Sequence, residues 1–157
     1  MNRKTPLLTI GLTILLGCGA LNPPLQAAVI KAASCSQANV QSAINSAANG
    51  NVVMIPAGTC TWTGGITLAK KIMLQGTGIG STIIIYSDGT LFVTSGESAN
   101  TFRMTGMEFQ NCTQCIYLDG DGSPKGAVKN FRIDHCKFKN AYVAVRNRWA
   151  CYGGIGS

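Results

Sequence analysis

An internal repeat constrains the fold of this chain more than any other feature of its sequence. Residues 102–111 (FRMTGMEFQN) align without gaps on residues 131–140 (FRIDHCKFKN), an offset of 29 residues, and four of the ten positions are identical. Leu74 precedes Met104 by 30 residues, so an earlier segment shares this spacing. A period of this length with short strands is typical of a solenoid, in which each coil contacts only its neighbours.

The identical positions predict which contacts the coils repeat. Two of them are phenylalanines, which are expected to stack from coil to coil in the core. A third is an asparagine, Asn111 in one coil and Asn140 in the next. At a turn, such a pair would form an asparagine ladder along the stack.

Composition supports an all-β chain with one helix. With 46% hydrophobic and 12% charged residues, the chain is neither disordered nor a coiled coil. Short Val, Ile and Leu runs separated by Gly, Asn and Thr predict many short strands. A helix is expected between residues 36 and 50, where Val40, Ala43, Ile44 and Ala47 have helical spacing.

The first 27 residues predict export. Arg3 and Lys4 precede an apolar run at residues 7–16, and a small residue, Ala27, follows a pair of prolines. We expect a signal peptide over residues 1–27 and a secreted, extracellular or periplasmic mature chain over residues 28–157. Cys18 leaves an alternative open, because its context resembles the lipobox of outer-membrane lipoproteins. A transmembrane anchor is disfavoured, since the apolar run is short.

Six cysteines remain after the signal peptide, at positions 35, 60, 112, 115, 136 and 151. In an exported chain an even number favours disulfides, although six cysteines allow 15 connectivities. Cys112 and Cys115 form a C-x-x-C motif between two strand-like segments. A zinc site would need further ligands, and a thioredoxin-like site would need a following helix.

The mature chain resembles the start of the pectin-lyase-like right-handed parallel β-helix proteins. The resemblance lies in residues 42–50 (SAINSAANG), which lead into 53–59 (VMIPAGT), and in the later pieces 61–62 and 72–78. It implies a right-handed parallel β-helix with an N-terminal amphipathic capping helix. It does not select an activity, because the superfamily includes polysaccharide lyases, glycoside hydrolases, epimerases, esterases, adhesins and phage tail proteins.

The resemblance also implies a small set of catalytic candidates. The aspartate cluster and the Gly-His-Gly segment of the hydrolases are absent from this sequence. Residues 133–135 (IDH) are similar to part of a Trp-Ile-Asp-His segment in pectate lyases, with Arg132 in place of the tryptophan. Lyases of this kind use an arginine or lysine as base, so the candidates are Arg132, Asp134 and His135. His135 is either a proton shuttle beside Asp134 or a solvated residue at a coil corner.

Asp119 and Asp121 are the candidate metal ligands. On an extended chain, carboxylates at i and i+2 share one face and could bind Ca²⁺. The surrounding glycines and Ser123-Pro124 favour a polar turn instead.

Positive charge is concentrated between residues 125 and 148, a stretch that contains seven basic residues and one acidic residue. Stacked coils would gather some of them into a stripe that suits an acidic polysaccharide or a cell-surface glycan. Nucleic acid is disfavoured by export and by the few aromatic residues, and a membrane partner is expected only if Cys18 is lipidated. The candidate binding residues besides Arg132 are Lys125, Lys129, Lys137, Lys139, Arg146 and Arg148.

Two functional classes stay open at this point. One is an exported lyase or hydrolase of acidic polysaccharide, and the other is a non-catalytic binding, adhesion or structural module. We expect roughly four coils, forming the N-terminal part of a longer protein. The disulfide that we expect is Cys35–Cys60, because it would pin the capping helix to the end of the first strand.

Overall fold

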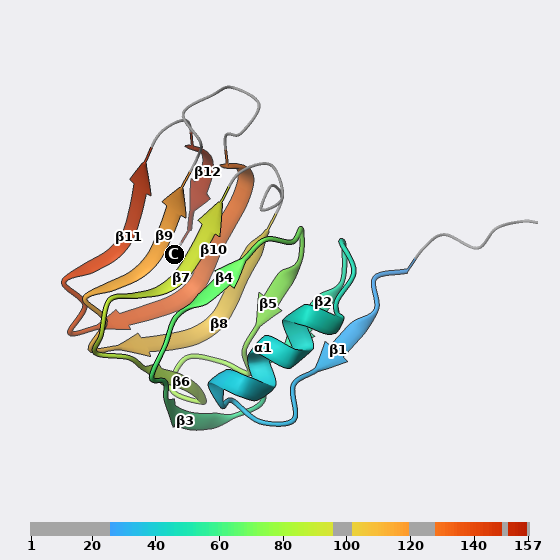
Figure 1. Ribbon diagram of the computed structural model, residues 1–157, viewed down its shortest axis with the longest axis horizontal. Helices are drawn as coiled ribbons and strands as arrows, with labels where there is room; N and C mark the ends of the chain where they lie inside the picture. The colour runs from blue at the N-terminus through green and yellow to red at the C-terminus, as the bar shows by residue number, and fades with distance from the viewer. Residues whose placement is uncertain (1–25, 96–101, 120–127, 149–150, 157) are drawn as a thin grey trace, which may run out of the picture.

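The computed structural model describes residues 26–95, 102–119, 128–148 and 151–156. The expected signal peptide therefore lies almost wholly outside the described residues, as do Cys18, Asp121 and Lys125. The described residues form one helix and two parallel sheets (Figure 1). The elements are β1 (Val29–Lys31), α1 (Gln37–Ser46), β2 (Val52–Met54), β3 (Gly58–Thr61), β4 (Ile66–Leu68), β5 (Met73–Gln75), β6 (Thr82–Ile85), β7 (Thr90–Ser95), β8 (Arg103–Gln110), β9 (Gln114–Asp119), β10 (Val128–Lys139), β11 (Val143–Arg148) and β12 (Cys151–Ile155).

The strands stack as a parallel β-helix with three faces. The first face runs β1-β2-β5 and continues through the N-terminal halves of β8 and β10 to β12. The second face consists of β3, β6 and the C-terminal halves of the same two long strands. The third face is the sheet β4-β7-β9-β11. The right-handed parallel β-helix expected from the sequence is confirmed.

The long strands bend where the first face meets the second. In β8 the bend is at Gly106, with a φ of 70°, and in β10 it is at His135, with a φ of 47°. In the two earlier coils the same corner is a loop, so β2 and β3, like β5 and β6, are separate strands. The next corner leads to the third face and has left-handed Asn111 and Asn140, with φ values of 60° and 51°.

The register confirms the repeat. Phe109 pairs with Phe138, and Arg103 pairs with Arg132, both at the 29-residue offset. The two phenylalanine pairs stack, with ring centroids 5.8 Å apart for Phe102–Phe131 and 5.4 Å apart for Phe109–Phe138. Asn140 Nδ2 donates to Asn111 Oδ1 at 3.3 Å, so the predicted asparagine ladder forms.

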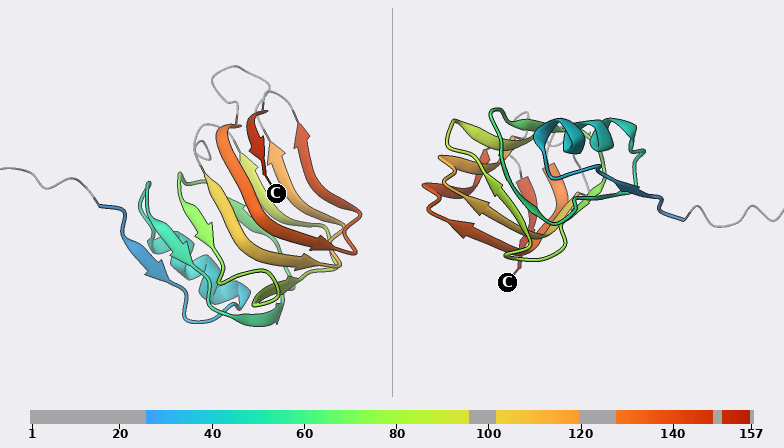
Figure 2. Two further views of the ribbon diagram at one scale, coloured as in Figure 1. Left: turned by 180° about the vertical axis from the view of Figure 1, so that it is seen from behind. Right: turned by 90° about the horizontal axis from the view of Figure 1, so that it is seen from below.

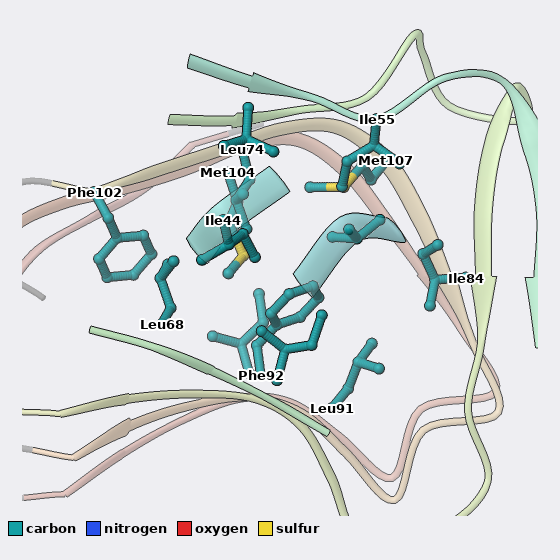
Figure 3. Close-up of a cluster of buried hydrophobic side chains, with 14 of the residues drawn as sticks. Ile44, Ile55, Leu68, Leu74, Ile84, Leu91, Phe92, Phe102, Met104 and Met107 are labelled. Carbon is teal, nitrogen blue, oxygen red and sulfur yellow. The ribbon is translucent and has the colours of Figure 1, made fainter. Parts of the chain in front are cut away.

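The core lies between the faces and is almost entirely apolar (Figure 3). Side chains from all three faces meet there, including Leu74, Met107 and Phe92, and each is fully buried. Burying a side chain of this size stabilises the fold by about 1.5–3 kcal/mol. Because each layer rests on the next, this gain depends on the stacking of neighbouring coils.

Helix α1 covers the N-terminal end of the stack (Figure 2). The Ser36 hydroxyl caps it by accepting from the backbone N–H of Asn39 at 3.4 Å. At the other end, Lys70 Nζ donates to the carbonyls of Ile44, Asn45 and Ala47 at 2.9, 2.7 and 2.7 Å. The helix has ten residues, and in the described part of the chain no helix is long and apolar enough to span a membrane.

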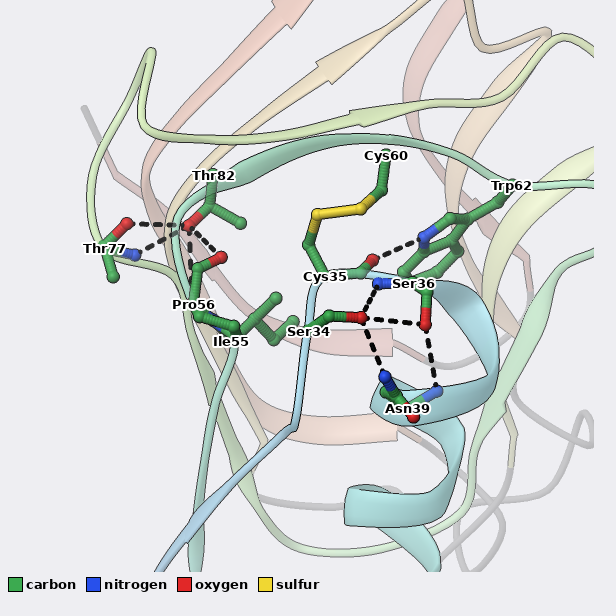
Figure 4. Close-up of a disulfide and its surroundings, with 10 residues drawn as sticks. All are labelled: Ser34, Cys35, Ser36, Asn39, Ile55, Pro56, Cys60, Trp62, Thr77 and Thr82. Atoms are coloured by element: carbon green, nitrogen blue, oxygen red, sulfur yellow. Dashed lines mark hydrogen bonds between the residues drawn. A yellow bond between two sulfur atoms is a disulfide. The ribbon is translucent and has the colours of Figure 1, made fainter.

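A disulfide joins the residue before the helix cap to the second face. Cys35 and Cys60 are bonded, with their Cα atoms 5.8 Å apart, as expected from the sequence (Figure 4). The indole N–H of buried Trp62 donates to the carbonyl of Cys35 at 2.9 Å. The start of the capping helix is therefore fixed to the first coil by a covalent bond and by a buried hydrogen bond.

Candidate functional site

Two arginines lie one above the other on the outside of the first face. Arg103 of β8 and Arg132 of β10 are register partners, and the residues after them, Met104 and Ile133, are buried in the core. Because side chains alternate along a strand, both guanidinium groups point outward. Their side chains are 38% and 63% exposed. The repeat therefore places two like charges on adjacent coils, in contact with solvent.

One carboxylate holds this pair. Asp134 is the next outward position of β10, and its side chain is fully covered, with 0% exposed. Arg103 Nε lies 3.2 Å from both carboxylate oxygens, and Arg103 Nη2 lies 3.0–3.1 Å from them. Arg132 Nε forms an ion pair with Oδ2. The carboxylate thus fixes both guanidinium groups, since such bonds are strong and directional.

The groups around Asp134 favour its ionised form. Burial raises the pKa of its carboxyl, but a hydrogen bond from Thr105, hydrogen bonds from Arg103 and the charges of Arg103 and Arg132 outweigh that effect. The net result is a pKa lowered from 3.8 to about 2. Thr105 is the register partner of Asp134 on the preceding coil. With both oxygens occupied, Asp134 is a positioning residue for the two arginines.

His135 occupies the corner beside this cluster. Its side chain is 67% exposed, and Nδ1 lies 3.6 Å from Asp134 Oδ1. The residue has a left-handed backbone conformation, which glycine adopts at the equivalent position 106. A left-handed residue other than glycine is strained, by about 1 kcal/mol or more. The corner geometry thus holds an exposed imidazole next to the arginine pair.

A depression of about 470 Å³ adjoins Arg103 on the N-terminal side. Besides Arg103, its lining is Asn49 and Gly50 from the turn before β2, and Lys71, Ile72 and Met73 at the start of β5. Met73 is the register partner of Arg103, and its sulfur lies 4.0 Å from Arg103 Nη1. The first face thus combines apolar lining with two cationic side chains, Lys71 and Arg103.

The basic residues singled out in the sequence do not share one face. Lys129, like Arg132, belongs to the first-face half of β10. Lys137 and Lys139 follow the bend at His135 and lie on the second face, where Lys137 Nζ is 3.7 Å from Glu108 Oε2. The predicted stripe is therefore divided, because each corner turns the chain to another side.

Arg146 and Arg148 lie on the third face, in β11. The guanidinium of Arg146 lies 5.8 Å from the ring centroid of Tyr117, and Arg148 Nη1 is 3.3 Å from the Tyr117 hydroxyl. These contacts hold both arginines against their own sheet, away from the cluster around Asp134.

Asp119, one of the two candidate calcium ligands, lies beside an arginine. Asp119 ends β9, and its Oδ1 is buried without a hydrogen bond, 3.8 Å from Arg148 Nε. A cation that already faces this carboxylate competes with a metal ion. Within the described ranges, no three His, Cys, Asp or Glu side chains are grouped so as to hold a metal. Asp121 lies outside these ranges, and Ca²⁺ binding stays a prediction.

Sequence reasoning selected Arg132, Asp134 and His135, and the structure places them together. It did not select Arg103 or Thr105, which lie on the preceding coil. A signal for Arg103 was present, because it is one of the four identical positions of the repeat. Its register with Arg132 is what brings a second guanidinium to Asp134.

Comparison with known proteins gives one informative likeness. An arginine-to-alanine variant of the PL6 family alginate lyase AlyGC superposes with a TM-score of 0.51, at 18% sequence identity, over 83% of this chain. This likeness and the pairing of the strands show that the described part of the chain has a parallel β-helix fold. It spans 18% of the length of the alginate lyase. No protein-family model and no curated protein matches this sequence.

Proposed function

We propose that this parallel β-helix is an exported protein that binds acidic polysaccharide through the arginine pair of its first face and takes part in cleaving it. The observation that carries the proposal is the pair Arg103 and Arg132, exposed on adjacent coils and fixed by the buried carboxylate of Asp134. Guanidinium groups held in this way match the carboxylate of a uronate sugar. The alginate lyase neighbour supports a carbohydrate-directed activity.

The geometry also suits a lyase reaction. In β-elimination, a base takes the proton from the carbon next to the uronate carboxylate, a carbon–carbon double bond forms, and the glycosidic C–O bond breaks as its oxygen takes up a proton. The negative charge that develops on the carboxylate during this step must be stabilised. A guanidinium stays charged in proteins, so Arg132 suits this electrostatic role better than the role of base that the family resemblance implies. His135 presents an exposed imidazole beside the arginine pair and is the candidate for moving the proton.

A second candidate function is binding without cleavage. Its support is that both oxygens of Asp134 are bonded to guanidinium groups, so this carboxylate positions cations and does not act as a base. A surface that fixes two arginines in this way can bind a polyanion without any reaction. The two candidates predict the same ligand and differ in the product.

The test compares alginate, polygalacturonate and neutral dextran as ligands of the mature chain. We expect both polyuronates to bind and dextran to bind much more weakly. Arg103→Gln and Arg132→Gln should each weaken polyuronate binding by about tenfold or more, since each removes a charged hydrogen-bond donor. Lys139→Gln is the matched control, because it removes one charge from the second face.

Equal binding of dextran, or an equal loss in Lys139→Gln, would refute the proposed site. Circular dichroism of each variant checks that the fold is kept. Release of unsaturated uronate products, followed by ultraviolet absorbance, separates cleavage from binding. An increase in absorbance that is lost in Arg132→Gln supports the lyase, and binding without any increase supports the second candidate.

A further inference from the structure

Cys112 and Cys115 lie at the corner between the second and third faces. The proposed function does not use either of them. Cys112 follows the left-handed Asn111, and Cys115 is the second residue of β9. Both side chains are buried, with 1% and 0% exposed, and both belong to the apolar core. Their thiol groups are hydrogen-bonded to each other. The two sulfur atoms are therefore neighbours inside the protein.

The backbone on both sides of this corner is fixed by the adjacent coils. The carbonyl of Cys112 accepts from the backbone N–H of Tyr142 at 3.0 Å, and the N–H of Gln114 donates to the carbonyl of Gly89 at 3.2 Å. One bond runs to the following coil and the other to the preceding coil. The corner therefore cannot open without breaking contacts to its neighbours, and the two cysteines stay together.

The pKa values of the two thiols are shifted in opposite directions. The hydrogen bond with Cys115 lowers the pKa of Cys112, while the pKa of Cys115 is raised by the same hydrogen bond and by burial. Since the thiolate is the nucleophile in thiol–disulfide exchange, Cys112 is the attacking sulfur. Cys136 offers a contrast, because burial raises its pKa to about 11 and its sulfur contacts the carbonyl of Met104 at 3.8 Å.

The same chain already contains an oxidised pair, Cys35–Cys60. Disulfides form and persist where an oxidant is present, and that oxidant meets every thiol pair that the folding chain brings together. Cys112 and Cys115 are free thiols in the structure, and they lie three residues apart at one corner with their side chains hydrogen-bonded to each other. A disulfide needs two cysteines whose side chains face each other at short range, as this pair does.

We propose that Cys112 and Cys115 form a second disulfide, which closes the corner between β8 and β9 by exchange with a glutathione-type disulfide. The exchange takes place while the chain folds, before the core closes over the two thiols: the Cys112 thiolate attacks one sulfur of the oxidant, and the other sulfur leaves as a thiolate that takes up the proton of Cys112. Cys115 then loses its proton and attacks the Cys112 sulfur, which releases the second thiol of the oxidant. The protein loses two electrons and two protons, and the oxidant disulfide is reduced to two thiols.

Trypsin separates the cysteines in a way that makes the test direct. Cys112 and Cys115 are the two cysteines of the peptide 104–125, Cys35 and Cys60 share the peptide 32–70, and Cys136 lies alone in 133–137. The reduced, unfolded chain is refolded in a buffer of reduced and oxidised glutathione. The chain is then unfolded in the presence of N-ethylmaleimide, which labels free thiols, and digested with trypsin. The masses of the peptides are measured by mass spectrometry.

We expect peptide 104–125 to carry no adduct and to be lighter than its reduced form by two hydrogen atoms. Two adducts on this peptide would overturn the proposal. Cys115→Ser is the control variant, in which we expect Cys112 to carry one N-ethylmaleimide or one glutathione, since the mixed disulfide then has no second thiol to resolve it, while peptide 32–70 is unchanged. If the Cys112 peptide of that variant is instead joined to another cysteine peptide, the partner of Cys112 is another cysteine and the proposal is wrong. No polysaccharide enters this experiment, so its outcome is separate from that of the proposed function.

Discussion

Replacing Asp134 by asparagine tests the arginine pair through the stability of the fold. The substitution keeps the shape of the side chain but removes the one charge that faces both guanidinium groups. The folded-state pKa of Asp134, about 2, is below the unfolded value of 3.8, so ionisation of this carboxyl stabilises the folded state. A group with a lowered pKa contributes its stability above the unfolded pKa and loses it as pH falls through the folded pKa.

The size of the effect follows from the same two values. At about 1.4 kcal/mol for each tenfold change in the proton dissociation constant, the lowered pKa corresponds to about 2 kcal/mol. The cover over Asp134 consists of the partly exposed side chains of Arg103 and Arg132, so solvent screening reduces this figure. We therefore expect Asp134→Asn to lower the free energy of unfolding by about 1–2 kcal/mol at pH 7.

Urea unfolding at pH 7, 5 and 3, followed by circular dichroism, measures the difference between the two proteins. We expect it to be the same at pH 7 and 5, about half as large at pH 3, and to vanish near pH 1. Asp88→Asn, at an exposed position, is the control and should change the stability by less than about 0.5 kcal/mol. A variant as stable as the unmodified chain at pH 7, or a loss that does not shrink at pH 3, would refute the reasoning.

Two further predictions concern the ends and corners of the coils. Lys70→Met removes three hydrogen bonds to the last carbonyls of α1, and we expect a loss of about 1–3 kcal/mol in urea unfolding. Asn140→Ala places a residue that tolerates the left-handed conformation less well than asparagine at this corner and removes the ladder bond to Asn111, which should lower the thermal unfolding temperature. Asn140→Gly removes only the bond and should cost less, and equal losses in the two variants would contradict the role of the corner.

The sequence predicted the parts of the fold that repeat. The phenylalanine stacks and the asparagine ladder follow from one gapless alignment, since register partners in a solenoid are separated by one period. The Cys35–Cys60 disulfide was predictable because a helix that caps the first coil must lie close to that coil. In each case the partners are set by the order of the elements along the chain.

The site was predicted only in part, because it depends on the direction of side chains at the corners. Lys137 is two residues from His135 but lies on another face, since the chain turns at His135. Arg103 is 31 residues from Asp134 and touches it, since the coils stack. Proximity along the sequence therefore does not show which basic residues share a face, whereas the register between coils does.

The contact between Arg103 and Asp134 makes the site a property of two coils and not of either one. In a solenoid the stability is close to a sum of terms for each coil and terms for each interface between neighbours. A polyanion that binds Arg103 and Arg132 together adds its binding free energy to the interface term alone. Ligand should therefore increase the cooperativity of unfolding between these two coils, so that they unfold as one unit.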